Sequence, residues 1–348
     1  MYDSNTQAVS DKLAAASSTV FTQETIDSIL SLVTTSTDPT VKVDTVEVKA
    51  NGTVNVTPGT ELVFISLSDT QQTKLVVNGN AQGVFFQGAG GVDATIGSAP
   101  PVADATGNKL AAVADSDAIQ RVVVGTAGAD IITIADRTNT QIIAGDKDVI
   151  KAGSGHTVVI AAQGSSTVQG GAETIVQAKG GDEDFSITVS NGHAKISNAK
   201  TGVSVDLSGV QYVQLDNKEA LIFADNAKQA AVAHLYQAVF GRTAEFDGLD
   251  FWFQMADKGV SLKAIAQGFM ASSEYKLATA SNAQFVDALY HGLMGRDGDA
   301  AGVNFWTDAL SHGVSRVDII TAFAEAAAAG NGEVHIVGSV TIVPGGMA

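Results

Sequence analysis

The sequence predicts a mixed fold: a short helical N-terminal segment, a β-rich region with a parallel β-roll or solenoid-like part, and an all-α C-terminal domain. Three observations predict it. Short runs rich in Val, Ile and Thr alternate with glycine turns, a nine-residue glycine pattern recurs among them, and a segment of helical periodicity is repeated near the end. Changes in composition and periodicity divide the chain into 1–39, 40–110, 111–225, 226–330 and 331–348.

Residues 1–39 are expected to be helical. Apolar side chains recur there at helical spacing, at Ile26, Ile29, Leu30 and Val33. Proline then ends the pattern, because the residue before a proline is driven out of the helical region.

Residues 40–110 are expected to form a β-rich domain of short strands, with Asn-Gly turns between alternating runs such as ELVFISL. The stretch GSAPPVADATGNK at 97–109 is interpreted as an internal linker, because it combines Pro and Gly with small polar residues.

Residues 111–225 carry the glycine pattern. The segment GTAGADIIT at 125–133 matches G-G-x-G-x-D-x-U-x, in which the glycines turn the chain, the Asp binds calcium and the large apolar residue U fills the core of a β-roll. Only Thr126 departs from it. Stepping by nine residues, U is kept at Ile132, Ile150, Val159 and Val168. The frame 134–142 fails, because Gln141 stands at U.

The carboxylate of the pattern is kept only at Asp130 and Asp148. One coil of such a roll is two nine-residue units, so these residues, 18 apart, are expected to lie one above the other. Calcium takes oxygen ligands and needs offsetting charge, so we expect one or two calcium positions here, with Asp146 assisting. The alternative is that both are turn residues bonded to their own backbone. The acidic turn Asp182–Asp184 is a weaker cation candidate.

The nine-residue pattern resembles that of RTX proteins, which Gram-negative bacteria secrete through type I machinery. The resemblance covers about five repeat units. It implies calcium binding and export through an uncleaved C-terminal signal, for which 331–348 is the candidate tail. It also agrees with the absence of a basic and apolar signal sequence at the N-terminus.

Residues 226–330 contain a duplication at an offset of 54 residues, since 236–272 aligns without a gap with 290–326. The eleven residues that recur are Tyr236, Gly241, Arg242, Gly248, Phe251, Trp252, Gly259, Val260, Ser261, Ile265 and Phe269. Glycines are expected to end helices, and Ser261 and Ser315 to cap the next ones.

The duplicated unit resembles a small uncharacterised helical domain that is common in RTX-type and surface-layer proteins. Its pattern runs Tyr, Gly-Arg, Asp, Gly, Trp, Gly, although the first copy has Glu245 for the Asp. The resemblance implies no activity. We expect Arg242 and Arg296 to pair with acidic loop residues, with glycan binding as the alternative. We expect Trp252 and Trp306 to be core residues, with sugar platforms as the alternative.

The composition disfavours several classes of partner and of catalytic site. A formal charge of −17 disfavours nucleic acid and anionic membranes as partners, and the chain has no cysteine for disulfides or thiolate sites. No apolar run approaches the ~20 residues that span a bilayer. The sequence contains no H-E-x-x-H, G-x-S-x-G or P-loop motif, so catalysis is not predicted.

The sequence therefore predicts an extracellular or cell-surface structural protein that self-assembles, with calcium assisting, into a surface layer, filament or biofilm matrix. Its expected partners are its own copies and cell-surface polysaccharide, with no transmembrane insertion. The alternative is a secreted polysaccharide-binding adhesin or polysaccharide-active enzyme that uses the solenoid as a groove. Chelator is expected to prevent the assembly of the structural protein, and incubation with polysaccharides tests the alternative.

Overall fold

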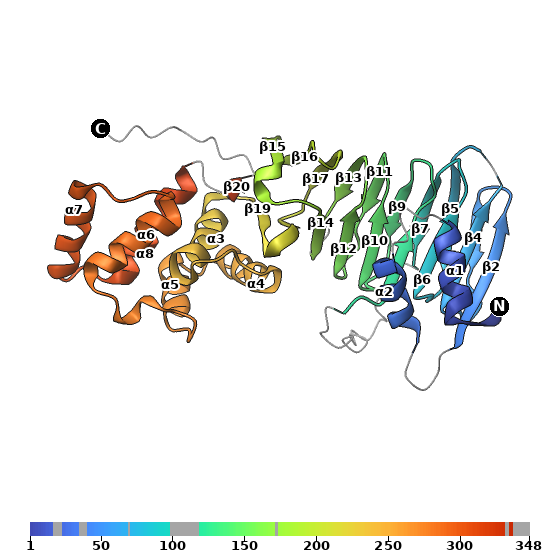
Figure 1. The fold of residues 1–348 in the computed structure, drawn as a ribbon, viewed down its shortest axis with the longest axis horizontal. Coiled ribbons are helices and arrows are strands. Elements are labelled where there is room, and N and C mark those ends of the chain that lie inside the picture. The colour runs from blue at the N-terminus through green and yellow to red at the C-terminus, as the bar shows by residue number, and fades with distance from the viewer. Residues whose placement is uncertain are drawn as a thin grey trace, which may run out of the picture. The chain divides into compact units, whose positions relative to one another are not determined.

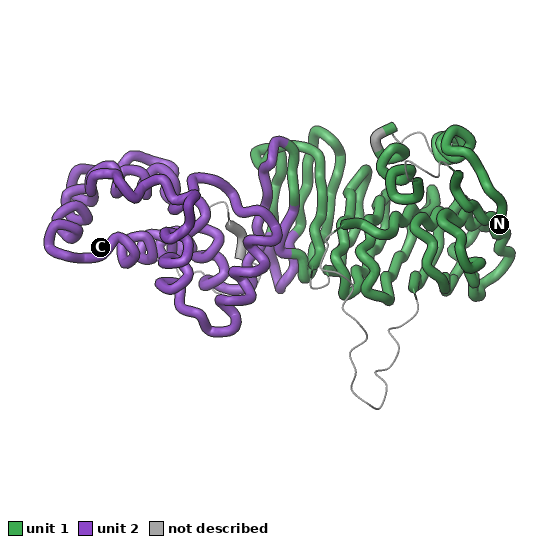
Figure 2. Tube along the Cα trace, turned by 90° about the horizontal axis from the view of Figure 1, so that it is seen from below, with its two compact units in different colours: residues 1–188, 195–210, 214–216 green, residues 189–194, 211–213, 217–348 purple. Residues whose placement is uncertain are grey.

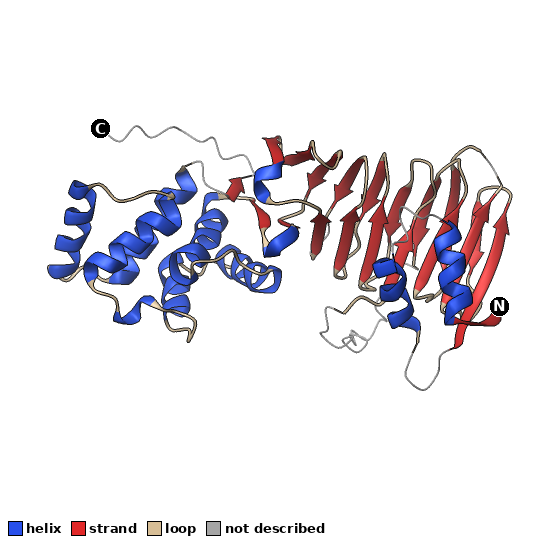
Figure 3. Ribbon diagram, viewed as in Figure 1, coloured by secondary structure: helices blue, strands red, loops and turns tan. Residues whose placement is uncertain are grey.

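The computed structural model describes residues 1–16, 23–34, 40–68, 70–97, 118–170, 173–330 and 334–336. It confirms the predicted fold class, with N-terminal helices, a parallel β-solenoid and C-terminal helices (Figure 3). The chain forms two compact units (Figure 2). Unit 1 comprises 1–188, 195–210 and 214–216, and unit 2 comprises 189–194, 211–213 and 217–348.

Unit 1 is a solenoid in which successive strands alternate between two sheets (Figure 1). Sheet A contains β1 (Tyr2–Asn5), β2 (Thr40–Val48), β4 (Leu62–Leu67), β6 (Gly83–Gln87), β8 (Arg121–Val124), β10 (Thr140–Ala144), β12 (Thr157–Ala161) and β14 (Thr174–Ala178). Sheet B contains β3 (Gly52–Asn55), β5 (Thr73–Asn78), β7 (Val92–Ile96), β9 (Ile131–Ile134), β11 (Asp148–Lys151), β13 (Ser165–Gln169), β17 (Val203–Ser208), β16 (His193–Asn198) and β15 (Phe185–Ser190). The pairs from β2 to β14 and from β3 to β17 are parallel, whereas β1 runs antiparallel to β2.

The core of the solenoid includes an apolar row from each sheet, and every member of these two rows is at most 2 % exposed. The row in sheet A is Val63, Val84, Val123, Ile142, Val159 and Val176. The row in sheet B is Leu75, Ala94, Ile132, Ile150, Val168 and Leu207. Burial of each large side chain contributes roughly 1.5–3 kcal/mol. The rows include all four residues that the sequence placed at U.

The frame 134–142, which fails in the sequence, is out of step by one residue. The core position between Ile132 and Ile150 is held by Ile142, which pairs with Val123 and Val159, and not by Gln141. The intervals are therefore ten and eight residues instead of nine and nine. Side chains of a strand alternate between its faces, so a slip of one residue turns Gln141 away from the core.

The strands before and after the predicted boundary at residue 110 belong to the same solenoid. β6 pairs with β8, and β7 pairs with β9, although residues 98–117 lie between them in sequence. The boundary and the linker interpreted at 97–109, apart from Gly97, fall outside the described residues.

Two helices, α1 (Thr6–Ala16) and α2 (Gln23–Val33), pack on one side of sheet A and confirm the predicted helical segment (Figure 1). The shared cluster is formed by Val9, Leu13, Ile26, Ile29, Val33, Val41, Val43, Leu62, Phe64, Phe85, Val122, Val124 and Ile143. Strands β4, β6 and β8 are thus covered on both faces, which explains their unbroken apolar runs.

Unit 2 contains strands β18 (Tyr212–Gln214, whose last residue belongs to unit 1), β19 (Ala220–Ala224) and β20 (Val334–Ile336), with β20 parallel to β19. Its helices are α3 (Ala227–Phe240), α4 (Phe246–Asp257), α5 (Leu262–Met270), α6 (Asn282–Met294), α7 (Ala300–Ser311) and α8 (Arg316–Ala329). Short 3-10 helices lie at Asp182–Asp184, Asp216–Lys218 and Leu277–Thr279. Within unit 2, α3 contacts α4, α5, α6 and α8. No helix of the described residues has the length and apolarity to cross a membrane.

The helix signals predicted from the duplication are confirmed. Gly241 and Gly295 end α3 and α6 with φ angles of 67° and 60°, in the left-handed region that favours glycine. Ser261 and Ser315 cap α5 and α8 by accepting backbone hydrogen bonds.

Candidate functional site

The two aspartates of the repeat lie in adjacent coils, as their spacing suggests. Asp130 is fully buried, and Asp148 is 2 % exposed. The amide nitrogen of Asp130 donates to Oδ1 of Asp148 at 2.9 Å. The same pattern repeats one coil earlier, where Val92 N donates to Oδ1 of Asp130 at 2.7 Å. Each carboxylate therefore links its own coil to the preceding one.

The two carboxylates also accept hydrogen bonds from their own turns. Thr126 N donates to Oδ2 of Asp130 at 2.6 Å, and Thr126 Oγ1 donates to Oδ1 at 2.8 Å. Gly145 N donates to Oδ2 of Asp148 at 2.7 Å. Such bonds to the local backbone are what we expect if Asp130 and Asp148 are turn residues and not calcium ligands.

Burial makes both carboxylates costly to ionise. It raises the pKa of Asp130 and raises the pKa of Asp148 to about 6, against the hydrogen bonds that favour ionisation. The charges of Asp130 and Asp146 raise the pKa of Asp148 further. No basic side chain of the described residues contributes an offsetting charge to either group.

Asp146 is placed differently. Its side chain is 52 % exposed, and its Oδ1 accepts from Ser165 N at 2.9 Å and Ser165 Oγ at 3.1 Å. These bonds lower the pKa of Asp146, and Lys147 lies 3.8 Å from its other oxygen. Asp146 therefore fixes the turn before Ser165 at the surface.

The residues fit calcium in charge and in ligand atoms at Asp130 and Asp148, because two buried carboxylates lack a counter-ion there. They also carry amide donors that a bound ion would have to replace. In the described part of the chain no three His, Asp or Glu side chains gather as a metal site. Calcium also takes carbonyl and water oxygens, so this finding concerns side-chain ligands alone. Calcium binding at Asp130, Asp148 and Asp146 stays a prediction.

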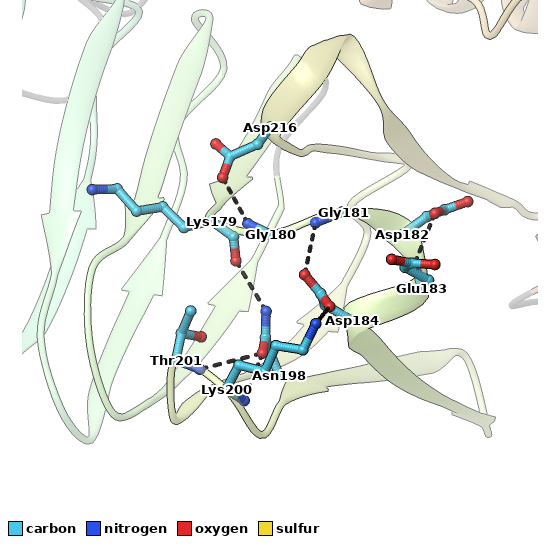
Figure 4. Close-up of polar contacts among 10 residues, drawn as sticks. All are labelled: Lys179, Gly180, Gly181, Asp182, Glu183, Asp184, Asn198, Lys200, Thr201 and Asp216. Carbon is cyan, nitrogen blue, oxygen red and sulfur yellow. Dashed lines mark hydrogen bonds and ion pairs between the residues drawn. The ribbon is translucent and has the colours of Figure 1, made fainter.

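The acidic turn Asp182–Asp184 is held by local bonds (Figure 4). Asp184 accepts from Gly181 N at 3.1 Å and forms an ion pair with Lys200. Asp182 accepts from Glu183 N at 2.7 Å. Lys200 already neutralises the carboxylate of Asp184, which accounts for the lowered pKa of Asp184 without a bound cation.

The same close-up shows how the neighbouring turns are tied together. Asp216 accepts from Gly180 N at 2.9 Å, and Asn198 donates to Lys179 O at 3.1 Å while accepting from Lys200 N at 2.9 Å (Figure 4). These bonds satisfy backbone groups where the strand rhythm after β14 changes. We assign them a structural role.

A buried ion pair was not predicted from the sequence. Arg121 begins β8 with a side chain 1 % exposed, and its guanidinium donates two hydrogen bonds to Asp136, at 3.1 and 2.7 Å. Thr138 Oγ1 accepts a third at 3.0 Å. The only sign of this ion pair in the sequence is that a basic residue begins the apolar run RVVV.

The expected pairing of Arg242 is present. Its guanidinium lies 2.6 Å from Glu245 and 2.6 Å from Glu274. Arg296 differs, because it donates to the carbonyl of Asp297 at 3.1 Å and lies over the Tyr290 ring at 5.3 Å. The second copy has Ala328 where the first has Glu274, so the acidic partner is missing from that position.

The tryptophans are half-buried and face the helical core. The ring of Trp252 packs against Phe269 at 5.1 Å, and that of Trp306 packs against Phe323 at 5.4 Å. The preceding residues were missed by the sequence interpretation: Phe251 is 51 % exposed, and Phe305 is 64 % exposed.

Comparison with known families agrees with the duplication. A family model described as "Domain of unknown function (DUF4214)" matches residues 222–279 and again 266–331. No significant match was found among curated proteins or solved structures. The chain thus joins a β-solenoid of repeated turns, as expected of an RTX-like repeat protein, to a helical region of which each copy is similar to DUF4214.

Proposed function

We propose that this protein is an RTX-like extracellular structural protein whose copies associate into a surface layer, filament or biofilm matrix. The observation that supports it best is the unpaired edge of sheet B. Among the described strands, β3 has a neighbour on one side only, which is β5. A strand with a free edge presents amide and carbonyl groups that pair readily with another chain.

The orientation of β3 identifies the groups involved. Val56 N, just after β3, donates to Asn78 O of β5 at 2.8 Å. Amide groups alternate in direction along a strand, so the even-numbered residues face β5 and Thr53 faces the free edge. The side chain of Thr53 is exposed, whereas that of Val54 is 5 % exposed and lies in the core. Thr53 is therefore the residue at which edge pairing can be blocked with least damage.

Helix α7 offers a second surface. No residue of α7 is buried, whereas α4, its counterpart in the first copy, buries Leu249, Phe253 and Ala256. In the first copy Phe246 meets the Tyr212 ring at 5.8 Å; the second copy has Ala300 at the position of Phe246. Because no residue of α7 is buried, its surface supports the association of a further chain at this helix.

Calcium is proposed to assist the association. Two buried carboxylates without a counter-ion destabilise their turns at neutral pH, and a divalent cation at Asp130 and Asp148 would offset both charges. Calcium would also screen the negative surface of a chain with a charge of −17. Both effects favour assembly where calcium is abundant, which is outside the cell.

Self-assembly is tested by light scattering and negative-stain electron microscopy of the full chain, in millimolar calcium and in chelator. We expect regular assemblies in calcium and dispersed chains in chelator. Thr53→Pro should reduce assembly, because proline removes the outward amide group. Thr53→Val is the matched control. Wild-type chains that stay monomeric in both conditions at tens of micromolar would refute the proposal.

Export is proposed to follow the type I route, with the protein outside the cell or on its surface. The test is expression in cells with and without a type I exporter, followed by assay of the medium. Secretion only with the exporter supports the proposal. Protein retained in both strains contradicts it.

A polysaccharide-binding adhesin is the second candidate. The exposed phenylalanines of the two helical copies favour it.

A further inference from the structure

The aligned segments 236–272 and 290–326 share eleven residues, and the fold gives a reason for all of them but one. Tyr236 and Phe269 pack ring to ring at 4.7 Å, and Tyr290 and Phe323 do so at 5.1 Å. Ile265 and Ile319 are fully buried. A Cβ on Gly248 or Gly302 would lie 2.5 or 2.2 Å from the hydroxyl of the adjacent Tyr236 or Tyr290.

The remaining shared residues close helices or pack on rings. Val260 N and Val314 N each donate, at 3.0 Å, to the carbonyl five residues earlier, which completes a C-terminal helix motif with the preceding glycine. Arg242 and Arg296 both lie over tyrosine rings. The shared residue without a role in the fold is therefore the exposed Phe251, which recurs as Phe305.

Both phenylalanines are held in the same way. Phe251 meets the edge of Trp252 at 4.9 Å with an angle of 79°, and Phe305 meets Trp306 at 5.0 Å with an angle of 78°. Each tryptophan is fixed in turn by a buried phenylalanine of the next helix. The two copies thus present an oriented aromatic ring to solvent.

The polar neighbours of the two rings are also equivalent. Asp250 and Gln254 flank Phe251, and Gln254 Nε2 donates to Asp250 at 2.6 Å. Asn304 and Asp308 occupy the same two positions beside Phe305. Each ring therefore has one carboxylate and one carboxamide beside it, in opposite order. Together they supply two donors and several acceptors at the edge of an apolar face.

This combination suits a neutral sugar. The C–H face of a pyranose packs on an aromatic ring, while its hydroxyls exchange hydrogen bonds with carboxylate and amide groups. The carboxylates and the overall charge of −17 disfavour anionic polymers. On α4, Phe251 is the one large apolar side chain exposed among the described residues. A single ring covers far less than the about 800 Å² on each side that a protein interface needs. Two equivalent sites on one chain match a ligand that itself repeats.

We propose that Phe251 and Phe305, with their flanking carboxylate and carboxamide, are two equivalent binding sites for a neutral polysaccharide. Binding at two sites on one polymer chain raises the overall affinity above that of either site. The inference is independent of self-assembly, because a monomeric chain would still carry both rings. It places glycan binding on the helical copies and leaves the solenoid free for other contacts.

The test is affinity electrophoresis of the full chain in gels containing dextran, laminarin or mannan, with alginate as the anionic control, in chelator to suppress assembly. Wild type should be retarded by at least one neutral polymer and not by alginate. Phe251→Ala or Phe305→Ala should weaken binding about tenfold, and the double variant should abolish retardation. Phe251→Trp should keep it, because the aromatic face is retained.

The control is Lys151→Ala, at an exposed position of the solenoid strand β11, and this variant should bind as wild type. Thermal melting of each variant checks folding. Absence of retardation by every neutral polymer, or equal retardation of the double alanine variant, overturns the proposal. A double variant that loses only assembly in calcium would instead assign the rings to contacts between chains, and overturns it too.

Discussion

Arg121 and Asp136 form a two-bond ion pair between the start of β8 and the turn after β9, with Nη2 and Oδ2 2.7 Å apart. A Cβ on Gly97, which directly follows β7, would lie 2.1 Å from Oδ2 of Asp136. The pair therefore lies where the end of β7, the start of β8 and the turn after β9 meet.

Asp136→Ala should destabilise the solenoid strongly. It leaves the guanidinium of Arg121 buried without a counter-ion, which costs about 3–5 kcal/mol. Urea unfolding followed by circular dichroism at the strand signal measures the loss. Replacing both residues, as Arg121→Met with Asp136→Leu, should recover most of it, because no charge is then buried alone. A single variant that unfolds at the wild-type midpoint would contradict this account.

Calcium binding should require Asp130 and Asp148. Asn at both positions keeps an acceptor oxygen for Gly145 N and Thr126 N but removes two formal charges, so titration calorimetry should show weakened or absent calcium binding. Asp146→Asn should weaken binding less, because that carboxylate is half-exposed. The control is Asp297→Asn, an exposed carboxylate of the helical region, which should bind as wild type. Unchanged calcium binding in the double variant would establish the two aspartates as turn residues only.

Trp252→Ala and Trp306→Ala should each cost about 2–3 kcal/mol in the free energy of unfolding of the helical region. Each removes a half-buried ring that packs on a core phenylalanine. Phe251→Ala and Phe305→Ala, one residue earlier, should cost well under 1 kcal/mol because those rings are largely exposed. Equal losses for the Trp and Phe variants would show that the exposed rings support the fold.

The helical region should lose stability in mild acid. Burial in α3 lowers the pKa of His234 below its ordinary 6.5, against a weak hydrogen bond with Gln237. The unfolded chain then binds more protons than the folded one, so the contribution of His234 to stability falls as pH drops from 7 to 5.

The control for this prediction is His234→Ala, because the second copy has Ala288 at the same position. The free energy of unfolding of the variant should fall less between pH 7 and pH 5 than that of wild type. An equal fall in both proteins would exclude His234 as the source of the acid sensitivity.

The periodic features of the fold were predictable from the sequence. Residues such as Ile132 and Ile150 recur because one core position must be filled in every coil, so the pattern survives without its carboxylates. The one-residue slip at Ile142 was not predictable, because it leaves both neighbouring frames intact. It is visible only in the pairing with Val123 and Val159.

Contacts between elements that are distant in sequence could not be predicted from the hydrophobic pattern. The apolar run of β4 indicates burial on both faces, but nothing in it identifies α1 and α2 as the cover. Likewise Leu249 and Val303 are equivalent in the duplication, yet only Leu249 is buried. α4 also meets Tyr212 through Phe246, whereas the second copy has Ala300 at the position of Phe246.

The strands on either side of a turn are held by the neighbouring coils, as β3 is by β5 and β4 is by β6. Between β3 and β4 the chain turns at the exposed Gly59, and nothing lies within 4 Å of a Cβ placed there. Foreign sequence, such as an epitope or a small folded domain, can therefore be grafted at that turn without changing the pairing of the strands. If the protein forms an ordered array, such a graft would appear once per subunit at a regular spacing, which makes the turn at Gly59 a natural display position.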